Sequence, residues 1–154
     1  METILITGAN RGIGFEIARQ LIEDGRNVIA TCRDPESASD LNALEASNLN
    51  IQKLEVTSTK SIAALGSALS GVQIDVLVNN AGEMGHKRQT VKDMDIDAWR
   101  HTFDVNTIAP LQISMALLDN LKLSPHPRMI SVSSQMGALS RASAGALAYQ
   151  SSKA

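Results

Sequence analysis

Residues 3–14 read TILITGANRGIG, an apolar run that leads directly into a turn containing three glycines. The run at residues 3–7 predicts a short buried strand, and a helix is predicted to begin at Gly12. Glycines allow close backbone approach, and a helix N-terminus offers free N–H groups and partial positive charge to a pyrophosphate. The spacing differs from G-x-G-x-x-G, because Gly8 opens the turn and the next glycine comes four positions later. We therefore expect a phosphate-binding turn, with a glycine-rich turn needed only for tight packing as the alternative.

Strand and helix patterns alternate along the rest of the chain. Strands are predicted at residues 3–7, 27–31, 51–56, 74–78 and 129–132, and helices at 12–24, 36–46, 57–69, 96–123 and around Tyr149, with loops at 83–95 and 133–144. Pro110 should bend the long helix, because proline removes one backbone hydrogen bond and clashes with the preceding turn. This alternation predicts an α/β fold, a doubly wound, Rossmann-like parallel sheet in three αβα layers with right-handed crossovers. Ligands of such a sheet bind at the carboxyl ends of its strands.

The composition is that of one ordinary globular domain. The chain has 154 residues, of which 44% are hydrophobic and 19% charged, so we expect a single domain over residues 1–154. A net charge of −2 and an aromatic content of 3% argue against nucleic-acid binding. The single cysteine, Cys32, permits no internal disulfide and no metal cluster, which favours a reducing, cytoplasmic location without a metal site. No apolar run is long enough to span a bilayer and no signal sequence is seen, so no membrane association is expected.

Tyr149 and Lys153 lie four residues apart in a run rich in alanine and serine. This spacing places both side chains on one face of a helix. A free phenol has a pKa of about 10, and an ammonium group one turn away favours the phenolate and lowers that pKa where both groups are partly shielded from water. The pair is therefore a candidate acid–base site. Because Y-x-x-x-K occurs often by chance, two residues on a solvated helix are the alternative if the pair stands alone.

Cys32 and Arg33 follow the second predicted strand, where an acidic residue would accept hydrogen bonds from an adenosine ribose. Arg33 and Arg11, from the glycine-rich turn, could instead converge on a 2′-phosphate, which arginine binds in a forked geometry. The arrangement favours NADP(H) over NAD(H). Two solvated surface arginines are the alternative, and Asp34 could pair with Arg33.

Further polar groups follow the fourth and fifth predicted strands. Residues 79–82 read Asn-Asn-Ala-Gly, in which amide side chains can tie strand ends together and the glycine permits close passage of a cofactor. Ser133 and Ser134 follow the fifth strand, where a hydroxyl would face the same edge of the sheet. Asn106 lies in the long helix. Each group alone would be an ordinary turn or helix residue.

In this order, the groups resemble the short-chain dehydrogenase/reductase family over essentially the whole chain. Residues 7–14 resemble its T-G-x-x-x-G-I-G loop, residues 79–82 its N-N-A-G segment and residues 149–153 its Y-x-x-x-K motif. The pattern around Ser134 is similar to the carbonyl-reductase branch that includes the C-factor signalling proteins. The resemblance implies a catalytic tetrad of Asn106, Ser134, Tyr149 and Lys153. It also implies a cofactor-binding set of Gly8, Asn10, Arg11, Gly12, Ile13, Gly14, Arg33, Asn80, Ala81, Gly82, Tyr149 and Lys153.

The implied function is an oxidoreductase that transfers a hydride between NADP(H) and a small carbonyl or alcohol substrate. Tyr149 would transfer the proton, Lys153 would lower its pKa and bind the nicotinamide ribose, Ser134 would hold the carbonyl oxygen, and Asn106 would anchor a water that relays protons. The resemblance also points to a homodimer through the helices containing Asn106 and Tyr149. The alternative is a nucleotide-binding signalling or interaction protein with little or no turnover on the same scaffold.

Three departures from the family pattern bear on these expectations. Ser134 lies about two residues further from Tyr149 than is common, so Ser133 remains the second candidate for the catalytic serine. Glu55 stands where relatives often have an aspartate that contacts adenine. The chain stops one residue after Lys153, whereas further strands would need on the order of 80 more residues. We therefore expect a dinucleotide-binding domain that is incomplete at its C-terminus and inactive or aggregating on its own.

Overall fold

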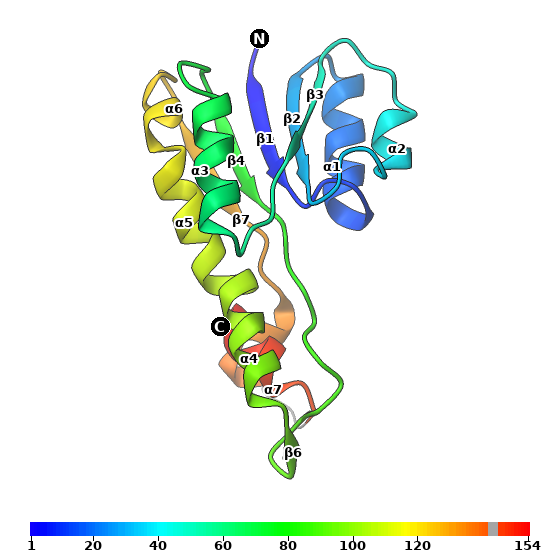
Figure 1. The fold of residues 1–154 in the computed structure, drawn as a ribbon, viewed down its shortest axis with the longest axis vertical. Helices are drawn as coiled ribbons and strands as arrows, with labels where there is room; N and C mark the ends of the chain where they lie inside the picture. The colour runs from blue at the N-terminus through cyan, green and yellow to red at the C-terminus, as the bar shows by residue number, and fades with distance from the viewer. Residues whose placement is uncertain (142–144) are drawn as a thin grey trace.

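A computed structural model describes residues 1–141 and 145–154, and its centre is a five-stranded parallel sheet (Figure 1). The strand order is β3-β2-β1-β4-β7, and every neighbouring pair runs parallel. The predicted doubly wound sheet is confirmed, with its switch point between β1 and β4. The strands are β1 (Thr3–Thr7), β2 (Asn27–Cys32), β3 (Leu49–Lys53), β4 (Val76–Asn79) and β7 (Arg128–Ser131).

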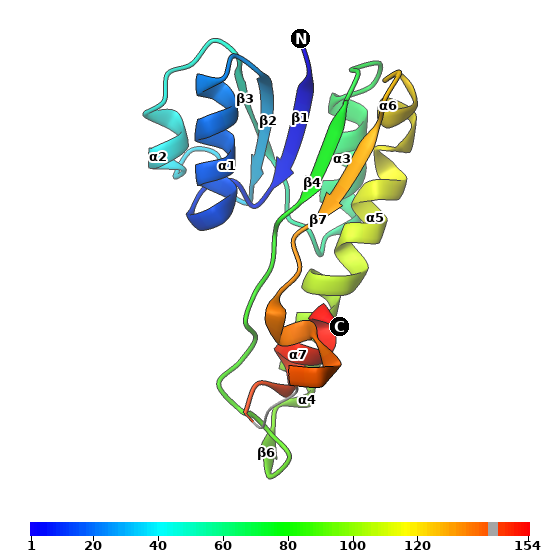
Figure 2. The ribbon, with the colours of Figure 1, turned by 180° about the vertical axis from the view of Figure 1, so that it is seen from behind.

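Helices cover both faces of the sheet (Figures 1 and 2). One face packs against α1 (Gly12–Glu23) and α2 (Ser39–Asn42), and the other against α3 (Thr59–Ala68), α5 (Ala109–Ala116) and α6 (Leu118–Lys122). Successive residues of β1 alternate between the two cores: Ile4 and Ile6 pack with α1, whereas Leu5 packs with α3 and α5. The buried residues of β1, β2 and β4 therefore suit the centre of a three-layer sheet, as predicted, whereas all four residues of the edge strand β7 are exposed.

Several predicted boundaries are wrong. The helix expected at residues 36–46 is only the four-residue α2, and Glu45, with φ +44°, lies in the left-handed region, which is incompatible with a helix. The strand expected at 51–56 is β3, which lies earlier because its register with β2 ends at the Cys32–Lys53 pair. The strand expected at 74–78 begins at Val76.

The two predicted loops contain short elements. Residues 83–95 include the hairpin of β5 (Gln89–Thr90) and β6 (Asp93–Met94). Residues 133–144 include two 3₁₀ turns, η2 (Gln135–Gly137) and η3 (Leu139–Arg141), and the last three residues of that predicted loop, 142–144, lie outside the described residues.

The long helix predicted at 96–123 is divided into segments. It begins as α4 (Ile96–Phe103), where Asp95 caps the start by accepting a hydrogen bond from Ala98 N at 3.0 Å. A π-helical turn, η1 (Asp104–Ile108), follows directly before Pro110, and the N–H of Ala109 bonds the carbonyl of Asp104. The wider turn accommodates the proline, so the predicted bend is a π-turn rather than a simple kink.

The carboxyl ends of the strands point toward a second group of elements, formed by α4, the β5–β6 hairpin and α7 (Leu147–Lys153) (Figure 1). Contacts join α4 to α7, α7 to η1 and α7 to β5. The chain therefore brings its last helix to the edge of the sheet where the glycine-rich turn lies. Among the described residues, none of the helices has the length and apolar character needed to cross a membrane.

Candidate active site

The glycine-rich turn leaves β1 and packs directly on the segment that follows β4. Gly8 has φ +65°, and a Cβ placed on it would lie 3.0 Å from the Cα of Ala81. A Cβ on Gly14 would lie 2.5 Å from the carbonyl oxygen of Gly8 and would also clash with the side-chain nitrogen of Asn80. Glycine is therefore required at both positions for close packing, apart from any role in ligand binding.

Thr7 and Asn80 fasten the ends of β1 and β4 together. The Thr7 hydroxyl oxygen accepts hydrogen bonds from the backbone N–H groups of Asn80 and Ala81, each at 3.0 Å. The Asn80 amide donates to the carbonyl oxygens of Thr7 at 2.9 Å and Gly8 at 3.1 Å. These bonds support the predicted tying of adjacent strand ends for Asn80, the second residue of the asparagine pair. Asn79, in contrast, points to Ser114 on α5.

A cleft of about 670 Å³ opens at this edge of the sheet. It brings together the predicted residues of the glycine-rich turn, Arg33 from the end of β2 and the segment from Asn80 to Gly82. Four polar residues complete it that were not in the predicted cofactor set: Glu55, Thr57, Glu83 and His101. Of these, only Glu55 carried a signal, because it follows the third strand where relatives have an acidic residue. The full lining is Gly8, Asn10, Arg11, Gly12, Ile13, Gly14, Cys32, Arg33, Leu54, Glu55, Val56, Thr57, Asn80, Ala81, Gly82, Glu83, His101 and Val105.

Arg11 and Arg33 are exposed, and neither makes an ion pair within residues 1–141 and 145–154. Asp34 accepts a hydrogen bond from Ser37 instead of pairing with Arg33. Cys32, the residue before Arg33, is also part of the cleft wall, and burial raises the pKa of its thiol. The cleft wall therefore contains the guanidinium groups of Arg11 and Arg33, which make no ion pair among the described residues, and the neutral thiol of Cys32.

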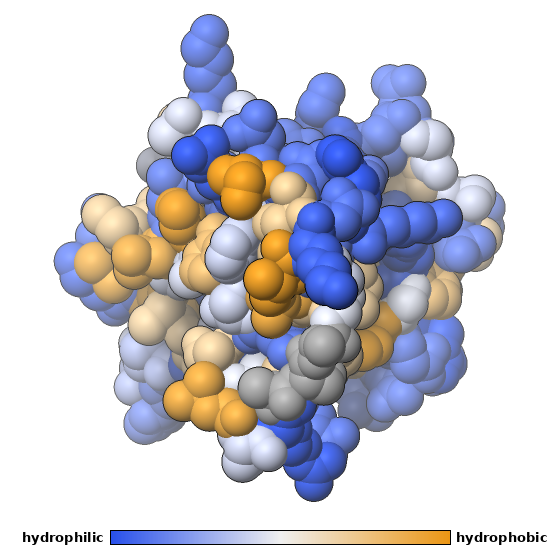
Figure 3. All heavy atoms as spheres, turned by 90° about the horizontal axis from the view of Figure 1, so that it is seen from below, coloured by the Kyte–Doolittle hydropathy of each residue, from blue (hydrophilic) through white to orange (hydrophobic). Residues whose placement is uncertain are grey.

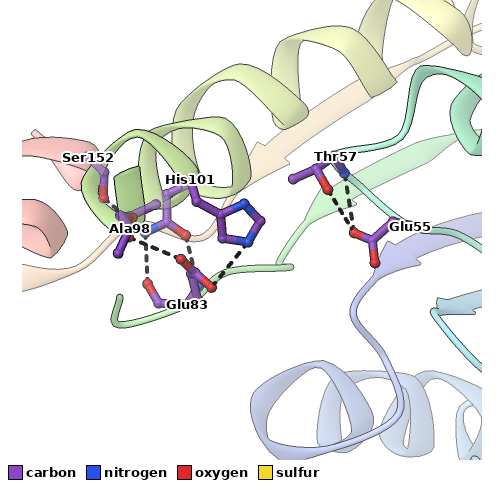
Figure 4. A network of polar contacts seen from close by, with 8 residues as sticks. Glu55, Thr57, Glu83, Ala98, His101 and Ser152 are labelled. Carbon is purple, nitrogen blue, oxygen red and sulfur yellow. Dashed lines mark hydrogen bonds and ion pairs between the residues drawn. The ribbon is translucent and has the colours of Figure 1, made fainter. Parts of the chain in front are cut away.

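Two carboxylates line the cleft on separate elements (Figure 4). Glu55 accepts hydrogen bonds from the hydroxyl and the N–H of Thr57, at 3.1 and 3.4 Å. Glu83 accepts a 3.0 Å bond from the Thr102 hydroxyl, and its second oxygen lies 3.8 Å from His101 Nε2. Both carboxylates are thus held in place by neighbours on their own side of the cleft.

The Asn106 side chain, buried in the π-turn, is occupied by three hydrogen bonds. Its oxygen accepts from the N–H of Glu83, and its nitrogen donates to the carbonyl of Glu83 and to the hydroxyl of Ser152, all at 2.9 Å. Asn106 therefore joins the cleft segment to α7. Pro110 has no N–H to offer the Asn106 carbonyl, which leaves that oxygen without its α-helical partner.

Lys153 and the serine pair are held together where β7 leaves the sheet. The Lys153 ammonium donates to the Val132 carbonyl at 2.9 Å and would lie 3.3 Å from a Cβ on Gly82, at the end of the cleft. Burial lowers the pKa of Lys153. The Ser133 hydroxyl donates to the carbonyl of Lys153 at 3.1 Å, whereas the Ser134 hydroxyl accepts from Met136 N at 3.2 Å.

Tyr149 lies one turn before Lys153 on α7, half-buried, so the predicted common helix is present. Its backbone is fixed at both ends: its N–H donates to the Gln89 side chain at 3.2 Å, and its carbonyl accepts from Ser152 at 2.9 Å. The Lys153 ammonium lies beside Gly82 at the end of the cleft, and the Tyr149 phenol is on the same helix. The lining of the cleft itself, among the described residues, includes none of the four predicted catalytic residues Asn106, Ser134, Tyr149 and Lys153. No group of three or more metal-ligating side chains occurs in the described part of the chain.

Comparison with known proteins places this geometry in context. Residues 2–154 match the family model described as short chain dehydrogenase. Human retinol dehydrogenase 13 is 34% identical over 140 residues, which are 86% of this chain and 41% of that protein. A carbonyl reductase from Pseudomonas aeruginosa PAO1 superposes with a TM-score of 0.90 at 32% identity, covering 99% of this chain and 69% of that one. Its structure in complex with NADP gives a TM-score of 0.87 at 30% identity, over 99% and 70% of the two chains. The chain spans about half the length of the curated relatives it matches.

Proposed function

The chain belongs to the short-chain dehydrogenase/reductase family, and from that premise we propose that it is the cofactor-binding part of an NADP(H)-dependent carbonyl reductase, or in reverse an alcohol dehydrogenase. The observation that carries the proposal is the single cleft that joins the glycine-rich turn, both free arginines and Gly82, with Lys153 at its end. Relatives described as carbonyl reductases, one of them in complex with NADP, support the same assignment.

The residues present fit a dinucleotide. Gly8 and Gly12 turn at positive φ, and a Cβ position on Gly12 has no atom within 4 Å, so backbone N–H groups at the start of α1 can reach a pyrophosphate. Arg33 and Arg11 would hold the 2′-phosphate of the adenosine ribose, and Asn10, Ile13, Gly14, Asn80 and Ala81 would shape the wall. When bound, the cofactor supplies or accepts the hydride.

The protein's own residues supply orientation and proton transfer. Tyr149 would donate its phenolic proton to the carbonyl oxygen of the substrate, and Ser134 would hold that oxygen through a hydrogen bond. Lys153 would bind the ribose hydroxyls and favour ionisation of the phenol. Ser134 is favoured over Ser133, because the Ser133 hydroxyl is used on the carbonyl of Lys153. The backbone carbonyl of Asn106, which Pro110 cannot bond, would hold the relay water, since the side chain bonds Glu83 and Ser152.

We also propose that the enzyme forms a homodimer through its α4 side. Trp99 and Phe103 surround a 380 Å³ hollow together with Ile96 and Ile108, and the apolar stripe continues along α5 and α6 through Leu111, Met115 and Leu118. Figure 3 shows the end of the molecule near α4 and α7, where hydrophobic patches lie among hydrophilic side chains. An apolar stripe of this extent is typical of a protein interface.

The experiment that tests the function is an assay of NADPH oxidation by the full-length protein with aldehydes and ketones of graded size. Turnover of at least one carbonyl compound, with slower or undetectable turnover when NADH replaces NADPH, is the expected result. Tight NADPH binding without turnover of any carbonyl or alcohol would contradict the enzyme and favour a nucleotide-binding signalling protein.

A further inference from the structure

Gln89, in the hairpin strand β5, links the segment beside the cleft to the helix that carries Tyr149. Its side chain is buried, with 6% of its surface exposed, and both ends of its amide are used. The nitrogen donates to the carbonyl oxygens of Met84 at 2.7 Å and His86 at 2.6 Å. The oxygen accepts from the backbone N–H of Tyr149 at 3.2 Å. A glutamine used in this way orders the groups on both sides of it.

The start of α7 explains why this bond matters. The first N–H groups of any helix lack partners within the helix, and α7 has Ala146 at its cap position, a residue with no side chain able to accept a hydrogen bond. The N–H of Gln150 bonds the carbonyl of Ala146 within the helix, whereas the N–H of Tyr149, one residue earlier, bonds Gln89. The side chain of Gln89, 60 residues earlier in the sequence, therefore acts as the N-terminal cap of α7.

The backbone carbonyl of Tyr149 is linked to the same segment through two side chains. The Ser152 hydroxyl donates to this carbonyl and accepts a hydrogen bond from the Asn106 amide. The Asn106 side chain also bonds both the N–H and the carbonyl of Glu83. Both polar backbone atoms of Tyr149 are therefore tied to residues 83–86, directly after Gly82 of the cleft. Lys153 is fastened separately, to Val132 and Ser133 of the β7 end.

We propose that Gln89 is a positioning residue, which sets the place of Tyr149 relative to the cofactor cleft by capping the first turn of α7. The inference rests on the proposed function for its catalytic consequence, but the capping itself does not. Without Gln89, the turn that carries Tyr149 loosens while Lys153 keeps its own anchors. Proton transfer should suffer, and cofactor binding should not.

The first test measures hydrogen exchange of the Tyr149 backbone amide in the full-length protein by NMR, for wild type and Gln89→Met. Methionine keeps the length of the side chain and removes both the acceptor for Tyr149 and the donor to the carbonyls of Met84 and His86. We expect the Tyr149 amide to lose protection while the amides of Ser152 and Lys153 keep theirs. Asn120→Leu is the matched control, because Asn120 is also a buried amide that donates to two carbonyls, Leu69 and Val72, at the opposite end of the molecule.

Retained protection of Tyr149 in a folded Gln89→Met protein would overturn the inference. Gln89→Glu is the second variant: as the protonated acid it keeps an oxygen that can accept from Tyr149 and an O–H that can donate to the carbonyl of Met84 or His86, so the amide should stay protected at a pH where this carboxyl is protonated. Loss of protection at that pH in a folded Gln89→Glu protein would also contradict the capping role. These exchange results stand even if the protein turns over no carbonyl compound, so failure of the proposed function is seen separately.

The second test measures kcat and the NADPH dissociation constant. A misplacement of about 1 Å costs on the order of 10²-fold in rate, so Gln89→Met should lower kcat by about tenfold to a hundredfold with NADPH affinity unchanged. Asn120→Leu should lower the melting temperature without lowering kcat selectively relative to NADPH affinity. Equal losses of kcat and NADPH affinity in Gln89→Met would indicate general structural damage and reject a positioning role.

Discussion

The Lys153 ammonium donates a 2.9 Å hydrogen bond to the carbonyl oxygen of Val132, the residue directly before the two serines. Ser133 returns a bond to the carbonyl of Lys153, so the end of β7 and the last turn of α7 are joined in both directions. A Cβ on Gly137 would run into the same Lys153 carbonyl, which shows how closely the two segments pack. The lysine is therefore fixed by the sheet edge at the end of the cofactor cleft, independently of Tyr149.

Arg33→Ala should weaken NADPH binding and leave NADH binding nearly unchanged. One charge-assisted hydrogen bond is worth about 1.5–3 kcal/mol, or about tenfold to more than a hundredfold in affinity. Fluorescence titration of both cofactors measures the effect, with Arg26→Ala as the control, since Arg26 is an exposed arginine paired with Glu2. Equal wild-type affinities for NADPH and NADH would contradict the assignment of the 2′-phosphate site.

Gly14→Ala should destabilise the fold and disturb the cleft. The new methyl group meets the Gly8 carbonyl at 2.5 Å and the Asn80 amide, both of which hold β1 against β4. Overpacking of this kind costs typically 1–3 kcal/mol in the free energy of unfolding. Gly66→Ala, in α3, is the control, because its methyl group would approach only the Ala116 carbonyl, at 3.4 Å. Urea unfolding of both variants should show the loss in Gly14→Ala alone.

Asp75 should make stability depend on pH in the acid range. Its side chain is 6% exposed, and the hydrogen bond from Ser124, helped by those from Thr3 N–H and Gln73, lowers its pKa. A carboxyl with a lowered folded-state pKa stabilises the fold above its unfolded pKa of about 3.9, and the contribution is lost as pH falls through the folded value. Wild type should therefore lose more stability than Asp75→Asn as pH is lowered from 6 to about 3. Parallel pH curves for the two proteins in urea unfolding would reject this role.

Met115→Glu should convert the proposed homodimer into a monomer, because it places a charge in the apolar stripe that runs from the α4 hollow along α5 and α6. Met115 is 67% exposed, so the change should not disturb the fold of one protomer. Light scattering of the full-length protein reads the mass directly. Lys60→Glu on α3 provides a charge-changing control outside the stripe. A wild-type monomer, or a Met115→Glu dimer of unchanged stability, would contradict the proposed interface.

Much of the sheet could be predicted because local patterns and global fold agree there. Continuous apolar runs and glycine turns mark β1, β2 and β4, and the strand ends collect Arg33 and Asn80 at one edge. The role of Asn80 as a strand tie follows from the same logic, whereas the matching bonds of the Thr7 hydroxyl are seen only in the structure. The resemblance favours Ser134 over Ser133, and the bond of the Ser133 hydroxyl to the Lys153 carbonyl, which no spacing reveals, agrees with that prediction.

The remaining site residues are brought to the site by long-range contacts that local sequence patterns do not show. Gln89 belongs to a two-residue strand, and its importance comes from contacts with residues 60 positions away. Glu83 and His101 meet only because the π-turn and α4 place them across the cleft segment. Long-range side-chain bonds of this kind depend on packing, so neither propensity nor motif spacing predicts them.

The most direct test of the account is kcat for carbonyl reduction by the full-length protein as wild type and as Tyr149→Phe, with NADPH dissociation constants measured for both. The substitution removes the transferable proton and keeps the ring, and a positioned proton donor contributes typically 10²–10⁴-fold. We predict a fall in kcat of about that size with NADPH affinity nearly unchanged, whereas Lys153→Ala should impair both. Near-normal turnover by Tyr149→Phe would show that Tyr149 is not the proton donor and would contradict the proposed mechanism.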